Sequence, residues 1–214
     1  MFLLPGGCPV TCLDVDPRAE ELLWLWFGQI SVEGLCEERV TRRWFRAGPA
    51  FDRECAEAFG EVVEEALGGG LESWNSAPRS CLALILLLDQ LPRNIHRGTA
   101  RAFAGDARAL ATAGALVDGG SHLELRPVER YFAYLPFEHA EDLAVQDRAV
   151  ALMGALAASP PPGGEALFAG GLEWAERHRV AIRRLGRFPA RNGALGREST
   201  ADEIAFLAEH PIGF

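Results

Sequence analysis

The sequence predicts an all-α protein, and three observations lead to this prediction. Apolar residues recur at helical spacing through most of the 214 residues, and no stretch shows the period-two alternation of a half-buried strand. Proline, glycine and capping residues separate these stretches at intervals of helix length. The length fits one domain, so we expect a single globular domain over residues 1–214, with about nine helices.

The first helices are indicated by their ends. Asp16 followed by Pro17 is a typical helix start, and the apolar run to Phe27 predicts a largely buried helix. Residues 1–15 are expected to form an irregular segment before it. Further helices are predicted over about residues 33–45 and 50–67, the second ended by the glycines at 68–70.

The most hydrophobic helix is predicted over about residues 76–88, and its all-round apolar character indicates a central position. Helices should follow near 106–116, 127–134 and 141–158. A Pro/Gly loop at 159–164 then precedes a long helix over about 165–185. Thr200 and Glu203 form a capping box for a last helix through residue 208.

Composition excludes several classes of protein. The net charge is −9, and all 21 basic residues are arginines, which argues against nucleic acid as a partner. The longest wholly apolar run, 81–88, is eight residues long, whereas a membrane span needs about 20. Five cysteines without a recognisable secretory leader indicate reduced thiols and a cytoplasmic location. No nucleotide- or zinc-binding motif is present, so we expect no cofactor and no metal.

One local pattern occurs twice: a large apolar residue and a proline shortly before Arg-Asn, in Leu91-Pro92-Arg93-Asn94 and in Phe188-Pro189-Ala190-Arg191-Asn192. Proline inside a helical pattern removes a hydrogen bond and frees a carbonyl. The Arg and Asn side chains could satisfy such carbonyls and act as braces. Alternatively, the two segments converge and their arginines bind an anion. Asp89, Gln90 and Arg97 flank the first segment, and Arg187 and Arg197 flank the second.

His139 is the histidine best placed for chemistry. It is surrounded by Glu138, Glu141 and Asp142 at a predicted helix start. An adjacent carboxylate could orient it for general acid–base work. The alternative is a cluster of acids that complements the helix dipole. His178 lies in the long late helix and is as well explained by packing as by function.

The longest of these motifs resemble a bacterial family known only as domain of unknown function nine-two-four. The similarity extends from about residue 19 onward, and it is carried by Asp89-Gln90-Leu91-Pro92-Arg93-Asn94, Leu135-Pro136-Phe137-Glu138-His139, Gln146, His178 and the tail Gly186-Arg187-Phe188-Pro189, Arg191-Asn192 and Leu195-Gly196-Arg197-Glu198-Ser199-Thr200. The resemblance implies an all-helical fold of the tetratricopeptide-like superfamily and no established activity. Two positions depart from the family pattern: Ala190 replaces the usual His, and Ala140 the usual Ser.

These observations favour a polar pocket that binds a small anionic ligand. In this hypothesis His139 is the general acid or base and Asp89 or Glu141 orients it. The remaining candidate ligand-binding residues are Gln90, Arg93, Asn94, Arg97, Gln146, His178, Arg187, Arg191, Asn192 and Arg197. The alternative is a tetratricopeptide-like interaction module, in which these residues are braces and a protein is the partner. The sequence indicates no oligomeric state.

Overall fold

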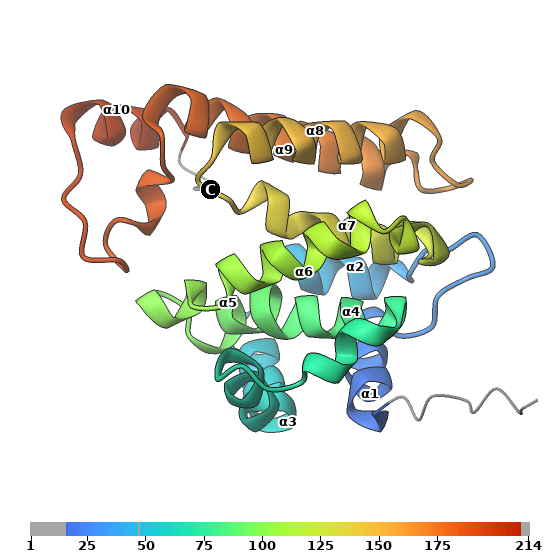
Figure 1. Cartoon of the computed structure of the whole chain (residues 1–214). Helices are drawn as coiled ribbons and strands as arrows, with labels where there is room; N and C mark the ends of the chain where they lie inside the picture. The colour runs from blue at the N-terminus through green and yellow to red at the C-terminus, as the bar shows by residue number, and fades with distance from the viewer. Residues whose placement is uncertain (1–15, 47, 211–214) are drawn as a thin grey trace, which may run out of the picture.

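A computed structural model of the chain describes residues 16–46 and 48–210, and within them it is all-α (Figure 1). The described residues form helices, 3-10 turns and one isolated bridge between Ile30 and Cys36. The predicted fold class is therefore confirmed. The predicted irregular segment 1–15 lies outside the described residues. Among the helices of the described residues, none has both the length and the apolar character that a membrane span requires.

The described part of the chain begins with three helices, α1 (Pro17–Phe27), α2 (Glu38–Arg46) and α3 (Pro49–Leu67). Asp16 caps α1 as predicted, because its side chain accepts a hydrogen bond from the Arg18 N–H at 3.0 Å. Gly68 ends α3, also as predicted. The second helix starts at Glu38, about five residues later than expected, because residues 31–34 form a turn beside the Ile30–Cys36 bridge.

The central helix is longer than predicted. After the 3-10 turn η1 (Glu72–Ser76), α4 (Pro78–Ile85) continues through the π turn η2 (Leu86–Gln90) into α5 (Leu91–Ile95). Every residue from Ser80 to Asp89 is buried. With these three elements taken as one helix, the described residues form nine helices, in agreement with the prediction.

The second half of the chain begins with helices that pack against this central helix and continues with a helix pair that packs against the last of them. It contains η3 (Ala100–Phe103), α6 (Asp106–Asp118), η4 (Ser121–Glu124), α7 (Pro127–Glu138), α8 (Leu143–Ala158) and α9 (Glu165–Leu185). The loop at 159–164 is where it was expected. In Figure 1, α8 and α9 lie side by side above α7, and α1 and α3 lie on the opposite side of the central helix. The tetratricopeptide-like classification stays a prediction.

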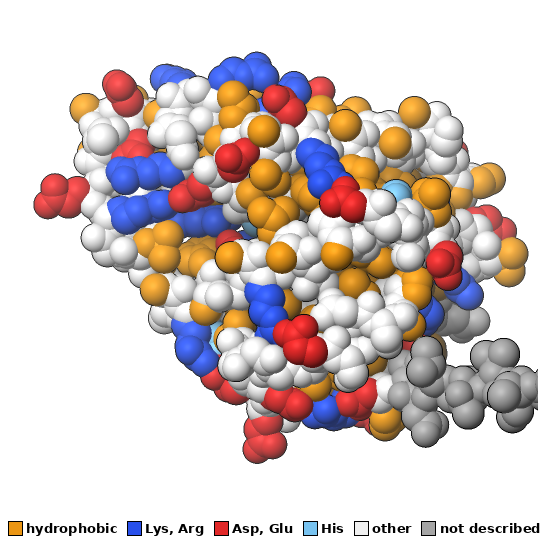
Figure 2. Space-filling model, viewed as in Figure 1, with side chains coloured by type: hydrophobic (Ala, Val, Ile, Leu, Met, Phe, Trp, Pro, Cys, Tyr) orange, Lys and Arg blue, Asp and Glu red, His pale blue; other side chains and the backbone are white. Residues whose placement is uncertain are grey.

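The C-terminal elements form a separate small unit beyond α9. They are η5 (Pro189–Arg191) and α10 (Ala201–Glu209), which begins with the predicted Thr200–Glu203 capping box. The main hydrophobic core extends from α1 to α9, whereas a second small cluster of Ala181, Ile182, Phe188 and Phe206 lies under α10. Figure 2 shows arginines and acidic side chains gathered together over this end of the molecule.

Candidate functional site

The site begins at the π turn of the central helix. Pro92 has no N–H to donate to the carbonyl four residues back, that of Leu88. Instead of breaking, the helix widens for one turn, and the Leu91 N–H donates to the carbonyl of Leu86. This corrects the expectation of a helix end near residue 88. Single π turns inside α-helices are frequent at functional sites, and this one contains Asp89 and Gln90.

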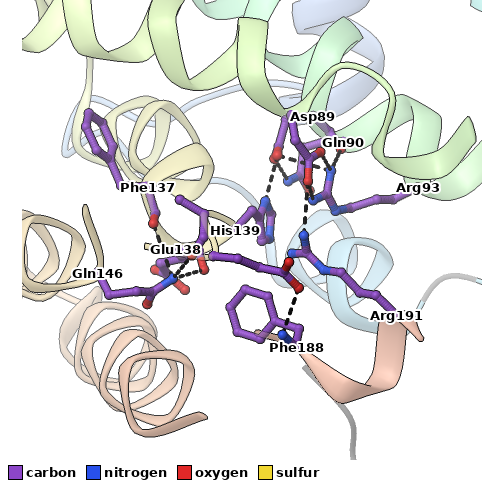
Figure 3. Close-up of polar contacts among 12 residues, drawn as sticks. Asp89, Gln90, Arg93, Phe137, Glu138, His139, Gln146, Phe188 and Arg191 are labelled. Carbon is purple, nitrogen blue, oxygen red and sulfur yellow. Dashed lines mark hydrogen bonds and ion pairs between the residues drawn. The ribbon is translucent and has the colours of Figure 1, made fainter. Parts of the chain in front are cut away.

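Asp89 is fully buried and joins three side chains (Figure 3). Its Oδ1 lies 2.6 Å from Nδ1 of His139 and 3.1 Å from Nη1 of Arg93, and its Oδ2 accepts from Nε2 of Gln90 at 2.5 Å. Burial alone would raise the pKa of Asp89, but the charge of Arg93 and the hydrogen bonds from His139 and Gln90 outweigh it and hold that pKa well below its usual range. Asp89 is therefore a carboxylate at neutral pH.

His139 is the C-cap of α7, which runs through Pro136 to Glu138, and not part of a helix start as expected. Burial and the nearby charge of Arg93 lower the pKa of His139, so its imidazole is neutral at neutral pH. A neutral ring bonded to the Asp89 carboxylate carries its proton on Nδ1, which leaves Nε2 as an acceptor. An imidazole oriented in this way is suited to act as a general base.

The two Arg-Asn segments, at residues 91–94 and 188–192, converge on one carboxylate. Arg93 donates to both oxygens of Asp106, at 2.8 and 2.9 Å, and Nη1 of Arg191 donates to Oδ2 of the same residue at 3.2 Å. Arg93 also donates to the carbonyl of Asp89. Arg93 therefore acts as a brace. Within the described residues, the side chain of Arg191 donates a hydrogen bond to Asp106 alone, so Arg191 remains a candidate for anion binding.

Arg191 is held in place by aromatic rings. Its guanidinium carbon lies 4.5 Å from the ring centre of Phe188 and 4.9 Å from that of Phe103, and its side chain is 8% exposed. Burial and the neighbouring charge of Arg93 lower the pKa of Arg191 to about 10. Arg191 is still a cation at neutral pH, with a charge that its surroundings compensate incompletely.

Arg191 and His139 line the same hollow, which has a volume of about 330 Å³. The hollow lies where α6, the turn between α7 and α8, and η5 meet. Leu110 and Pro136 form part of its apolar wall, and Ala140 also lines it. Its remaining polar lining comes from Asp106, Glu141 and Asp142.

Glu141 connects the C-terminal unit to the rest of the molecule and does not contact His139 as an orienting group. It accepts from the Phe188 N–H at 2.8 Å and from both terminal nitrogens of Arg197, at 2.8 and 3.0 Å. Burial opposes its ionisation, but these donors lower the pKa of Glu141 below its usual value. Asp142 caps α8 through the Val145 N–H at 3.0 Å, so this part of the predicted cap cluster is confirmed.

Three further candidates are braces within the C-terminal unit. Arg197 donates to Asn192 at 2.9 Å and to the carbonyl of Phe188 at 3.0 Å. Asn192 donates to Oε2 of Glu203 at 3.1 Å, and Arg187 reaches both oxygens of that carboxylate at 2.5 and 3.0 Å. Arg187, Asn192 and Arg197 therefore fix the segment that carries Arg191.

A second group of titratable side chains lies behind His139. The ring of His178 is 6.1 Å from that of His139, and its Nδ1 lies 2.8 Å from the Trp174 carbonyl and 3.6 Å from Oε2 of Glu138. Burial lowers the pKa of His178 to about 3. Burial and the charge of Asp89 raise the pKa of Glu138 well above its usual value, and its Oε1 is buried without a hydrogen-bond partner.

The other candidates have defined structural contacts. The side-chain amide of Gln146 donates to the carbonyls of Glu138 and Ala140 at 2.6 and 2.8 Å, which fixes the turn after α7. Asn94 and Arg97 both donate to Asp52 of α3 and do not line the hollow. Within the described residues, no cluster of three or more His, Cys, Asp and Glu side chains could hold a metal ion.

Sequence reasoning missed Asp106, Glu138 as a buried acid, and the aromatic pair Phe103 and Phe188. Asp106 is in the first turn of α6, where an acidic residue is ordinary, so no local signal marks it. Ala190 is exposed next to Arg191.

Comparison with known proteins identifies a family and a similar structure. The family model described as bacterial protein of unknown function (DUF924) matches residues 22–211. A solved structure of a protein of unknown function from Agrobacterium tumefaciens is similar, with a TM-score of 0.76 and 35% sequence identity, over 92% of this chain and 99% of that one. No curated protein matches the chain.

Proposed function

The chain belongs to the bacterial family of unknown function DUF924, and we propose that it binds a small ligand with an anionic group in the hollow between α6, α7 and η5. In this proposal Arg191 binds the anionic group and His139 exchanges a proton with the ligand or with a bound water molecule. Asp89 orients His139. Arg93, Arg187, Asn192 and Arg197 are braces that hold these groups in position.

One observation carries the proposal: a cation and a neutral imidazole line one hollow, and each is held rigidly from behind. Arg191 is clamped between the rings of Phe103 and Phe188, and His139 is bonded to Asp89 at 2.6 Å. A buried, incompletely compensated guanidinium gains from an anion. Groups positioned before the ligand arrives cost less entropy when it binds.

The general-base role follows from the direction of the pKa of His139. A neutral imidazole at neutral pH can accept a proton through Nε2 without first losing one. Once protonated, it would be stabilised by the Asp89 carboxylate, as in other Asp–His pairs. The chemistry supported here is proton transfer on a small anionic substrate.

The test is a thermal-shift screen of the full chain against small carboxylates and phosphates. A ligand at 100 times its Kd adds about 2.7 kcal/mol of stability, which raises the Tm of a chain of this length by about 5–10 °C. Arg191→Met keeps an apolar stem between the two phenyl rings and removes the cation, so it should abolish the shift. Arg183→Met, at an arginine that is 58% exposed outside the hollow, is the matched control and should keep it. A shift that persists in Arg191→Met would overturn the proposal.

A further inference from the structure

The hollow contains acceptors as well as a cation, and this identifies the class of ligand more closely. We infer that the ligand is a small α-amino acid with an apolar side chain, whose carboxylate binds Arg191 and whose ammonium group binds Asp142 and His139. The inference rests on the proposed function, because it assigns the occupant of the same hollow.

The first argument is charge. Among the described residues that line the hollow, Asp106, Glu141 and Asp142 are acidic, whereas Arg191 is the one arginine. The arginines just behind the wall do not reverse this balance. Arg93 pairs with Asp89 and Asp106, and Arg197 pairs with Glu141, so the carboxylates of this group still outnumber its arginines. A dianion such as phosphate would be repelled by these carboxylates, whereas a zwitterion brings one charge of each sign.

The second argument is the distribution of donors and acceptors. Arg191 offers only N–H donors, which suit a carboxylate. Nε2 of His139 is an acceptor, because Nδ1 is bonded to Asp89. Asp142 is exposed and uses Oδ1 to cap α8, which leaves carboxylate capacity for a second donor. An ammonium group supplies the donors that these acceptors need.

The third argument is size and apolar lining. At about 330 Å³, the hollow is at the small end of ligand-binding cavities. Leu110 and Pro136 offer an apolar surface beside the polar groups. A short branched side chain such as that of valine matches this surface.

A matched series of compounds separates the parts of the ligand. We would titrate the full chain by calorimetry, at neutral pH and low salt, with L-valine, isovalerate (no ammonium group), isobutylamine (no carboxylate), 2-hydroxyisovalerate and inorganic phosphate. Valine should bind more tightly than isovalerate, isobutylamine or the hydroxy acid by at least about threefold, because each analogue loses one partly exposed charge contact. Phosphate should bind more weakly than valine.

Two variants test the assignment of Asp142. Asp142→Asn removes the charge but preserves the helix cap, because Asn caps as well as Asp. It should weaken the binding of valine about three- to fivefold and leave the affinity for isovalerate unchanged. Asp147→Asn, on the same helix but outside the hollow, is the control and should change neither affinity.

The outcomes distinguish this inference from the function on which it rests. If isovalerate or phosphate binds as tightly as valine and Arg191→Met abolishes that binding, the amino-acid assignment is wrong and the anion site remains. If Asp142→Asn weakens the binding of valine and of isovalerate equally, the assignment of Asp142 as a partner of the ammonium group is wrong. If no compound of the series binds, the assignment is also wrong, and the thermal-shift screen decides separately whether another anion occupies the site.

Discussion

Gly105 is predicted to be the glycine on which the central helix depends most. A Cβ atom built at this position would lie 2.1 Å from the carbonyl oxygen of Leu88 and 2.9 Å from its Cα. Leu88 is inside the π turn, and its carbonyl is the one that Pro92 leaves without its helical donor. The backbone of Gly105 is in the right-handed helical region at φ −92°, so alanine meets no backbone strain there and its cost is purely steric.

The magnitude follows from this contact. The Leu88 backbone is fixed within a buried helix and would have to move by about 1 Å to restore a normal contact, which places the change among overpacking substitutions that cost about 1–3 kcal/mol or more. We expect Gly105→Ala to lower the free energy of unfolding by about 3 kcal/mol and the Tm by about 6–12 °C. Because Asp89 follows Leu88 directly, the same shift should also disturb the bond to His139.

The matched control is Gly114→Ala within the adjoining α6. A Cβ there meets no atom within 4 Å, and alanine is favoured over glycine in a helix by about 1 kcal/mol. Urea unfolding followed by far-UV circular dichroism measures both variants against the wild type. The reasoning is refuted if the free energy of unfolding of Gly105→Ala lies within about 0.5 kcal/mol of the wild-type value, or if Gly114→Ala lowers that free energy as much as Gly105→Ala does.

Three further predictions concern the buried charges. Asp89→Asn should lower the free energy of unfolding by about 3–5 kcal/mol, because the charge of Arg93 then lacks one of its carboxylate partners. The control is Asp118→Asn, which removes one partner of an exposed ion pair and should change the free energy of unfolding by under about 0.5 kcal/mol. Glu138→Gln should stabilise the protein relative to the wild type, increasingly as pH rises above about 4.5. The reason is that the raised pKa of Glu138 makes the native state hold a proton which the unfolded chain releases. Urea titrations of both proteins at acidic and at mildly basic pH would contradict this if the difference between their free energies of unfolding stayed constant. Below about pH 6.5 the unfolded chain protonates His178, whereas the native state, with its pKa of about 3, does not. The free energy of unfolding of the wild type should therefore decrease as the pH falls, by up to about 1.4 kcal/mol per pH unit from this group. A His178→Gln variant whose free energy of unfolding depends on pH as steeply as that of the wild type would exclude His178 as the cause.

The ends of many helices were predictable because they depend on neighbouring residues. Asp16 caps α1 from one position away, Gly68 ends α3, and Thr200 and Glu203 cap α10 as the sequence indicated. Each of these signals is a local hydrogen bond or a local backbone preference. Where tertiary burial competes with local preference, the predictions were less accurate. The helix expected to end near residue 134 runs through Pro136 to Glu138, along a segment that is almost entirely buried.

The candidate site was predictable in its residues but not in their roles. The two Arg-Asn motifs and His139 are indeed close together, since Arg93 and Arg191 share Asp106 and Asp89 contacts His139. Which arginine is a brace and which lines the hollow depends on a carboxylate 13 residues away from Arg93 and 85 from Arg191. A single sequence contains no signal for a pairing at that distance.

The separate hydrophobic cluster under α10 has a consequence for the stability of individual parts of the molecule. Phe188 and Phe206 belong to this cluster and not to the main core, and Glu141 and Asp106 hold η5 to the rest of the chain through polar contacts. Such a unit is expected to open as a subglobal exchange unit while α4 and α7 remain protected. Amide protons of residues 187–209 should then exchange faster than those of α4, and faster still at high salt. An occupant that binds Arg191 on one side and His139 on the other should slow exchange in both units at once.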